Sequence, residues 1–123
     1  MGHSARVADV RLDFMKRCAD NISGALLGDG AFSPGPALWV GKREVAHFDA
    51  LDELDVRLTK DVISERRPEL RSDERIELRR GTSDWIRVRV RSTSDLDDAF
   101  ALVRDAVRAN LPTAPTESRG RRV

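Results

Sequence analysis

The sequence has little of what catalytic and metal-binding motifs need. Its 123 residues include one cysteine, Cys18, and only two histidines. A single cysteine forms no disulfide within the chain, and no pair of cysteines is present to hold zinc or an iron–sulfur cluster. The sequence also has no nucleophile elbow, Walker loop or dinucleotide fingerprint. We therefore expect no metal and no bound cofactor.

Long apolar runs and an excess of one charge are lacking as well. No apolar run reaches the length of about 18 residues that spans a bilayer, and the first residues lack the charged start and hydrophobic core of a signal peptide. These absences predict a cytoplasmic location with no membrane contact. The formal net charge is only +1, which argues against nucleic acid as the main partner.

Three stretches have the spacing of helices. Apolar residues at intervals of three or four predict an amphipathic helix over residues 5–22. A second long helix is predicted over residues 94–110, opened by Ser94 and Asp97 as a variant of the capping box. Between them, Thr59 can cap a short helix that runs to about Arg67, just before a proline.

Five short segments are predicted strands, and in the last three of them apolar and polar residues alternate, as in strands with one wet face. These segments are residues 37–40, 43–48, 54–58, 75–79 and 84–90. Gly41 and Lys42 form a two-residue link suited to a tight hairpin, and Gly81 marks the turn of a second hairpin. The glycines and prolines between Gly28 and Pro36 predict a loop there.

The order of these elements predicts one α+β domain over residues 1–111. We expect an antiparallel sheet of about five strands, with two long helices packed on one face and a short helix between strands. Residues 112–123 carry no core-forming pattern and are predicted to be a flexible tail. The sequence does not choose between a monomer and a homodimer.

An alternating row of arginines is the most distinctive polar feature. Arg87, Arg89 and Arg91 are expected to line one sheet face together with Arg57 and Arg79, beside Trp85 as a stacking plane. Guanidinium groups in such a row bind carboxylate or phosphate groups. The other interpretation is a solvated face in which acidic residues of neighbouring strands, such as Asp55, pair with the arginines.

His47 lies in a predicted strand close to two acidic residues, Glu44 and Asp49. Histidine and carboxylate side chains are metal ligands, but one usable imidazole without cysteine argues against zinc, and we predict no metal site. Imidazole titrates near neutral pH, so His47 could also serve an enzyme as a general base.

Three segments carry a family resemblance, residues 41–49, 54–58 and 83–88. In that order they present a G-x-R-E segment leading to a histidine, an acidic strand and a tryptophan strand, and a helix follows. This pattern resembles the bacterial luciferase-domain family of small proteins over about residues 37–110. The resemblance implies a compact α+β fold, and it does not imply light production. Family members often carry a second histidine two residues after the first, where this chain has Asp49. The positions that match the family pattern are Arg43, Glu44, His47, Asp55 and Trp85.

We favour a non-enzymatic binding or interaction module whose arginine-rich sheet face accepts an acidic small molecule or a protein partner. One alternative is a small enzyme with His47 as general base, and another is a weak nucleic-acid binder, which the balanced charge disfavours. The candidate ligand-binding residues are Arg43, Glu44, His47, Asp55, Arg57, Trp85, Arg87 and Arg89.

Overall fold

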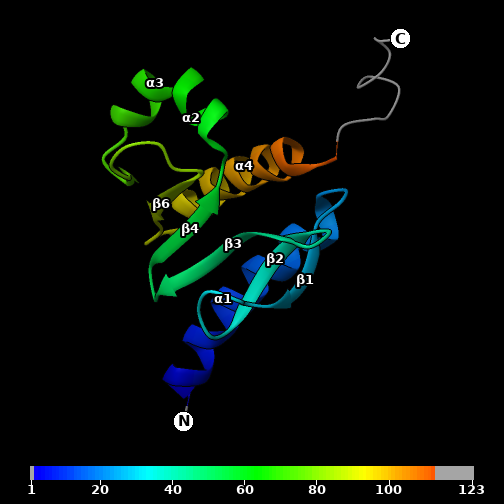
Figure 1. The fold of residues 1–123 in the computed structure, drawn as a ribbon. Coiled ribbons are helices and arrows are strands. Elements are labelled where there is room, and N and C mark those ends of the chain that lie inside the picture. Colours follow the sequence, from blue (N-terminus) through cyan, green and yellow to red (C-terminus); the bar gives the residue numbers. More distant parts are fainter. Residues whose placement is uncertain (1, 113–123) are drawn as a thin grey trace.

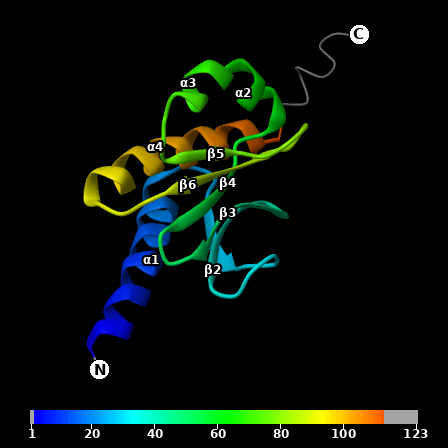
Figure 2. The ribbon, with the colours of Figure 1, turned by 90° about the vertical axis from the view of Figure 1, so that its left-hand side faces the viewer.

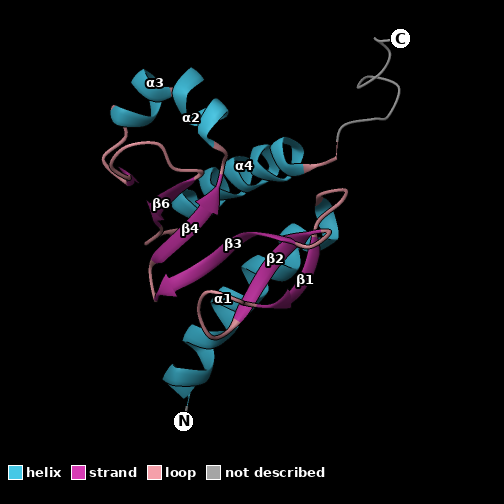
Figure 3. Ribbon diagram, viewed as in Figure 1, coloured by secondary structure: helices cyan, strands magenta, loops and turns pink. Residues whose placement is uncertain are grey.

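Six strands form one open antiparallel sheet in the computed structural model, which describes residues 2–112, with side chains from residue 10 onward (Figure 3). Their order across the sheet is β1-β2-β3-β4-β6-β5. The predicted α+β fold is confirmed, with one strand more than expected. The strands are β1 (Leu26–Asp29), β2 (Pro36–Val40), β3 (Arg43–Ala50), β4 (Glu53–Arg57), β5 (Ile76–Leu78) and β6 (Trp85–Arg89).

Two long helices, α1 (Gly2–Asn21) and α4 (Thr93–Asn110), cover one face of the sheet (Figures 1 and 2). Helix α1 contacts β1 and β2, whereas α4 contacts β3 and β4. The short helix expected between strands is two helices, α2 (Lys60–Glu65) and α3 (Arg67–Arg71). Pro68 explains the division, because proline has no N–H to continue α2 but fits the first turn of α3.

The hydrophobic core lies between the two long helices and the apolar face of the sheet. Phe14 from α1 meets Phe48 from β3 edge to face at 6.0 Å, and Val103 from α4 is fully buried. Cys18 is buried too, and burial raises the pKa of its thiol to about 12, as expected for a thiol that packs as a small hydrophobe. Burying each large apolar side chain contributes about 1.5–3 kcal/mol. Val10, which has the spacing of the apolar residues that predicted this helix, is exposed.

The N-cap of helix α4 lies two residues before the predicted one, Ser94. Ser92 is the N-cap, and its Oγ accepts a hydrogen bond from Asp95 N at 3.0 Å. The Asp95 carboxylate in turn accepts from Arg91 N at 2.9 Å. Ser92 and Asp95 have the same spacing as Ser94 and Asp97, so the capping-box pattern fits both pairs. In the structure, Ser92 and Asp95 form the cap.

The stretch predicted as a loop from residue 28 contains the end of strand β1, and this part of the prediction was wrong. Gly28 pairs with Ala37 of β2 and lies under the indole of Trp39. A Cβ atom on Gly28 would lie 3.1 Å from Trp39 Cδ1, so the glycine makes room for the ring and is not a turn residue. Residues 30–35 do form a loop.

Both predicted hairpins are present. Val40 pairs with Arg43 around the two-residue turn of Gly41 and Lys42, and Gly41 has φ +59°, the sign that the first central position of a type II′ turn requires. In residues 2–112 no helix is long and apolar enough to cross a membrane. The predicted flexible tail lies outside the described residues, apart from Pro112.

Candidate functional site

Three acidic or basic side chains are buried on the sheet face that the long helices leave open. They are Glu44, His47 and Asp55, each no more than 6% exposed. His47 of β3 lies directly opposite Asp55 of β4, and Asp55 lies opposite Arg87 of β6. The pairing register therefore aligns a histidine, a carboxylate and a guanidinium in one row across three strands.

A β-bulge brings Glu44 into this row. In a regular strand, residues three apart point to opposite faces. The register with β2 shifts between Leu38, which pairs with Ala46, and Trp39, which pairs with Glu44, so that Val45 is left as the extra residue. Glu44 and His47 consequently share a face and come into contact.

The His47 ring is held between two carboxylates. Its Nδ1 lies 2.7 Å from Glu44 Oε2, and its Nε2 lies 3.1 Å from Asp55 Oδ2. The second contact is a hydrogen bond, whereas the first is an ion contact outside hydrogen-bond geometry. Burial alone lowers the pKa of His47, but the hydrogen bond and charge of Asp55 and the charge of Glu44 outweigh it and raise that pKa. A ring with both nitrogens protonated has no lone pair with which to act as a general base.

Asp55 is shared between His47 and Arg87. Arg87 Nε donates to Asp55 Oδ1 at 2.8 Å, and the same guanidinium reaches Asp49 at 2.7 Å and Glu53 at 3.3 Å. Burial raises the pKa of the Asp55 carboxyl, but the hydrogen bonds from His47 and Arg87 overcome this and lower it to about 2. Hydrogen bonding to Asp55 also raises the pKa of Arg87. Each of these pKa shifts of His47, Asp55 and Arg87 favours the charged form of the group.

The predicted arginine row is only partly available to a ligand. Arg57 hydrogen-bonds Asp84 at 3.2 Å and lies over the Trp85 ring at 5.7 Å. Arg89 follows on the same face opposite Glu53, away from His47. Arg79, which is 46% exposed at its side chain, lies 3.6 Å from Asp55 without a hydrogen bond to it. Arg79 is thus the cation near His47 that carboxylates neutralise least.

The loop of residues 30–35 covers the buried cluster and was missed as a functional segment. Ala31 N donates to Glu44 Oε1 at 2.7 Å, and Ser33 Oγ donates to Phe48 O at 3.3 Å. Phe32 is 68% exposed. Its ring centroid lies 6.1 Å from that of His47 and 5.9 Å from that of Trp85. The sequence did contain one signal for this segment, because Phe32 is an aromatic residue within a predicted loop of glycines and prolines.

These elements enclose a pocket of about 340 Å³ between the loop and the strands. Its walls combine aromatic rings with both signs of charge. Arg43 and Arg57 do not line it, nor does Arg89, so the structure brings only part of the predicted set together. Within the described residues, no group of three or more His, Cys, Asp or Glu side chains could hold a metal ion. The lining residues are Phe32, His47, Asp49, Asp55, Arg79, Ser83, Trp85 and Arg87.

Gly30→Ala is expected to displace the loop from the cluster. Gly30 N donates to Gly35 O at 2.9 Å and closes the loop, and a Cβ on Gly30 would lie 2.3 Å from Ser33 O. Because that neighbour is backbone, the loop has to move, at a cost of about 1–3 kcal/mol. Urea denaturation measures the loss, and a changed Trp85 emission reports the movement of Phe32. A variant with wild-type stability and emission would contradict this role of Gly30.

Comparison with protein families matches the luciferase domain to residues 42–106, which is more than half of the chain. The chain belongs to the luciferase-domain family. The resemblance read from the sequence is therefore confirmed, over a slightly shorter range. The comparisons with curated proteins and with solved structures give no match. The luciferase-domain match contains Glu44, His47, Asp55 and Trp85, whereas the covering loop of residues 30–35 precedes it.

Proposed function

We propose that this luciferase-domain protein is a non-enzymatic module that binds an acidic small molecule in the pocket beside His47. The observation that carries the proposal is the position of the under-neutralised Arg79 in a pocket walled by Phe32 and Trp85. A pocket with apolar walls and a few fixed polar groups is typical of small-ligand sites, and about 340 Å³ falls at the small end of their range.

The polar groups of the pocket favour an anion. His47 and Arg87 are already bonded to the buried carboxylate of Asp55, which leaves Arg79 to pair with the ligand. Ser83 Oγ accepts a hydrogen bond from Trp85 N at 3.1 Å, so its own hydroxyl proton is available for donation. A carboxylate or phosphate group fits between these two donors, with the apolar part of the ligand against the rings.

Binding is favoured over catalysis because the pocket offers no activated nucleophile. Ser83 would need a neighbouring base, and the only imidazole of the pocket lies between Glu44 and Asp55, whose charges raise its pKa and favour its protonated form. The charged network instead fixes His47 and Arg87 as rigid parts of the wall. Fixed walls lower the entropy cost of binding a small ligand.

The test is a thermal-shift screen of small carboxylates and phosphates with a matched pair of variants, Arg79→Met and Arg89→Met. A ligand present at 100 times its Kd stabilises the fold by about 2.7 kcal/mol, which raises Tm by several degrees. We expect hits with the wild type and with Arg89→Met, because Arg89 lies outside the pocket. We expect Arg79→Met to lose most of the shift. Equal shifts in both variants would count against the proposal.

A further inference from the structure

We propose a second ligand site at the turn of the β2–β3 hairpin, for a planar ring that carries a phosphate group, as in a nucleoside monophosphate. This site is a pocket of about 890 Å³ that shares only Phe32 with the pocket beside His47. Its volume lies within the range of about 300–1,000 Å³ that is common for ligand sites. This second site goes beyond the proposed function, and the two proposals can be tested separately.

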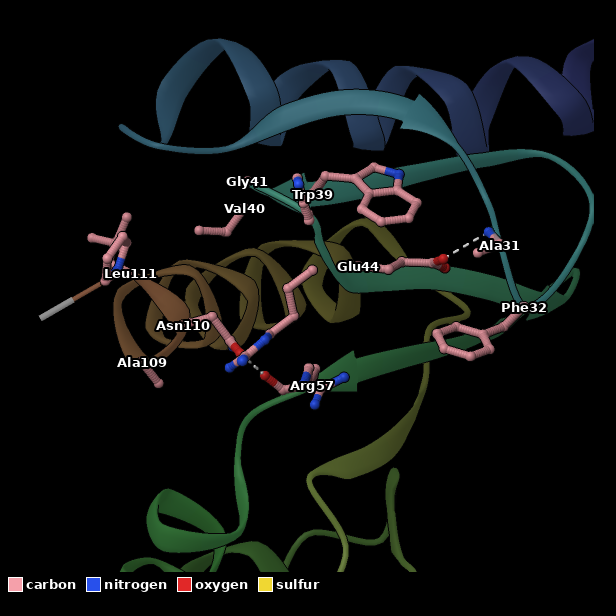
Figure 4. A pocket seen from close by; sticks show the side chains of 13 residues that line it. Ala31, Phe32, Trp39, Val40, Gly41, Glu44, Arg57, Ala109, Asn110 and Leu111 are labelled. Atoms are coloured by element: carbon pink, nitrogen blue, oxygen red, sulfur yellow. Dashed lines mark hydrogen bonds between the residues drawn. The ribbon is translucent and has the colours of Figure 1, made fainter.

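Figure 4 shows how separate elements enclose this pocket. Trp39 projects over it from β2, and Arg57 approaches from the end of β4. The last turn of α4, with Asn110 and the following Leu111, closes the opposite side, while Phe32 comes from the 30–35 loop. The walls thus include an indole, a phenyl ring and aliphatic side chains, together with polar groups at defined places.

The Trp39 indole is held in position before any ligand arrives. Its Nε1 donates to Asp29 O at 3.1 Å, and its five-membered ring lies against the backbone of Gly28. The ring is half-buried and still lines the pocket. A fixed aromatic plane offers stacking to a flat ring at little entropic cost.

The charge around this pocket favours an anion. Lys42 and Arg43 extend from the hairpin turn, and neither makes an ion pair within the described residues. Glu44 is the one carboxylate in the lining, and it is engaged by Ala31 N and by His47. Two adjacent cations without partners suit a phosphate, which carries close to two negative charges at neutral pH.

A buried donor and a buried acceptor on one wall lack partners in the described residues. They are Arg57 Nε and Asn110 Oδ1, and Asn110 is only 7% exposed. The Asn110 amide is fixed because its Nδ2 donates to Arg57 O at 2.9 Å and to Ala106 O at 2.7 Å. Unpaired buried polar groups are rare. The Arg57 side chain is 23% exposed. A ring edge that both accepts and donates, as the adenine edge does, would satisfy both atoms.

The two tryptophans allow each pocket to be tested alone, because Trp39 lines the hairpin pocket and Trp85 lines the pocket beside His47. In Trp85→Phe, emission comes from Trp39, and we expect titration with AMP to quench it saturably. Adenosine, which lacks the phosphate, and inorganic phosphate, which lacks the ring, should each bind at least about tenfold more weakly. In Trp39→Phe, emission from Trp85 reports acidic ligands of the other pocket.

The double variant Lys42→Ala/Arg43→Ala, made in the Trp85→Phe background, tests the anion contacts. We expect its affinity for AMP to fall about tenfold or more while its affinity for adenosine stays unchanged, since only the phosphate partners are removed. Its Tm should equal that of the parent, because both side chains are at the surface turn. Absence of saturable quenching of Trp39 by millimolar AMP, or unchanged AMP affinity in the double variant, overturns the site. Neither result bears on ligands detected through Trp85.

Discussion

Replacement of Asp55 by alanine is expected to destabilise the fold by about 3–5 kcal/mol, the range found when one partner of a buried ion pair is removed. The loss is large because two cations depend on this carboxylate. His47 Nε2 lies 3.1 Å from it, and Arg87 Nε donates to it at 2.8 Å. Both would remain in the protein with their charges and without their shared acceptor. Urea denaturation of wild type and variant gives the difference.

Asp49→Ala is the matched control for Asp55→Ala. Asp49 bonds the same guanidinium of Arg87 at 2.7 Å, but its side chain is 46% exposed, whereas that of Asp55 is 5% exposed. Exposed ion pairs contribute about 0–1 kcal/mol, so we expect a loss of that size. If the two variants lost equal stability, burial of the cluster would not be what makes Asp55 important.

The same contacts that make Asp55 important for stability also hold the wall of the pocket beside His47 in place. Asp55, His47 and Arg87 all line the pocket beside His47, and they bond to one another within its wall. Charged groups held this way keep a fixed place when a ligand arrives, which is the requirement for a preorganised site. In the proposed binding site, the charged side chain left to pair with a ligand is then the exposed Arg79.

Much of the fold could be predicted because local patterns and tertiary packing agree. Alternation over residues 75–79 and 84–90 predicted strands with their apolar residues on the more buried face, since the helices cover one side of the sheet only. The two-residue turn of Gly41 and Lys42 fixed the first hairpin through backbone geometry that glycine permits. Strand β1 was missed because Gly28 has a packing role that composition does not distinguish from a turn.

Several residues of the candidate pocket could be named from the sequence, but their arrangement could not. A pattern of period two places Glu44 and His47 on opposite faces, and only the bulge at Val45 brings them together. Strand register puts Asp55 between His47 and Arg87, and the pairing with Arg87 joins segments 32 residues apart in the chain. The 30–35 loop contacts the cluster through backbone groups such as Ala31 N, which every residue type possesses. For that reason no side-chain pattern marks the contact.

Stability is expected to be greatest between about pH 4 and pH 6.5 and to fall on both sides, because the cluster titrates at both ends. The pKa of Asp55 falls from 3.8 to about 2 on folding, so its contribution is complete above pH 3.8 and is lost as the pH falls towards 2. A lowering of that size corresponds to roughly 2 kcal/mol. Folding raises the pKa of His47 above 6.5, so its contribution is complete below pH 6.5 and is lost as the pH rises through the raised value.

His47→Gln separates the two ends of this profile. Glutamine keeps a polar side chain between Glu44 and Asp55 but does not titrate, so the loss of stability above pH 6.5 should disappear from denaturation curves measured between pH 4 and pH 9. The acid limb should remain, because Arg87 still donates to Asp55 in the variant. If wild type and His47→Gln instead lost stability in parallel above pH 6.5, the imidazole would be neutral in the folded protein. One of its nitrogens would then face a carboxylate oxygen without a proton between them, and the 2.7 Å and 3.1 Å contacts could not both persist.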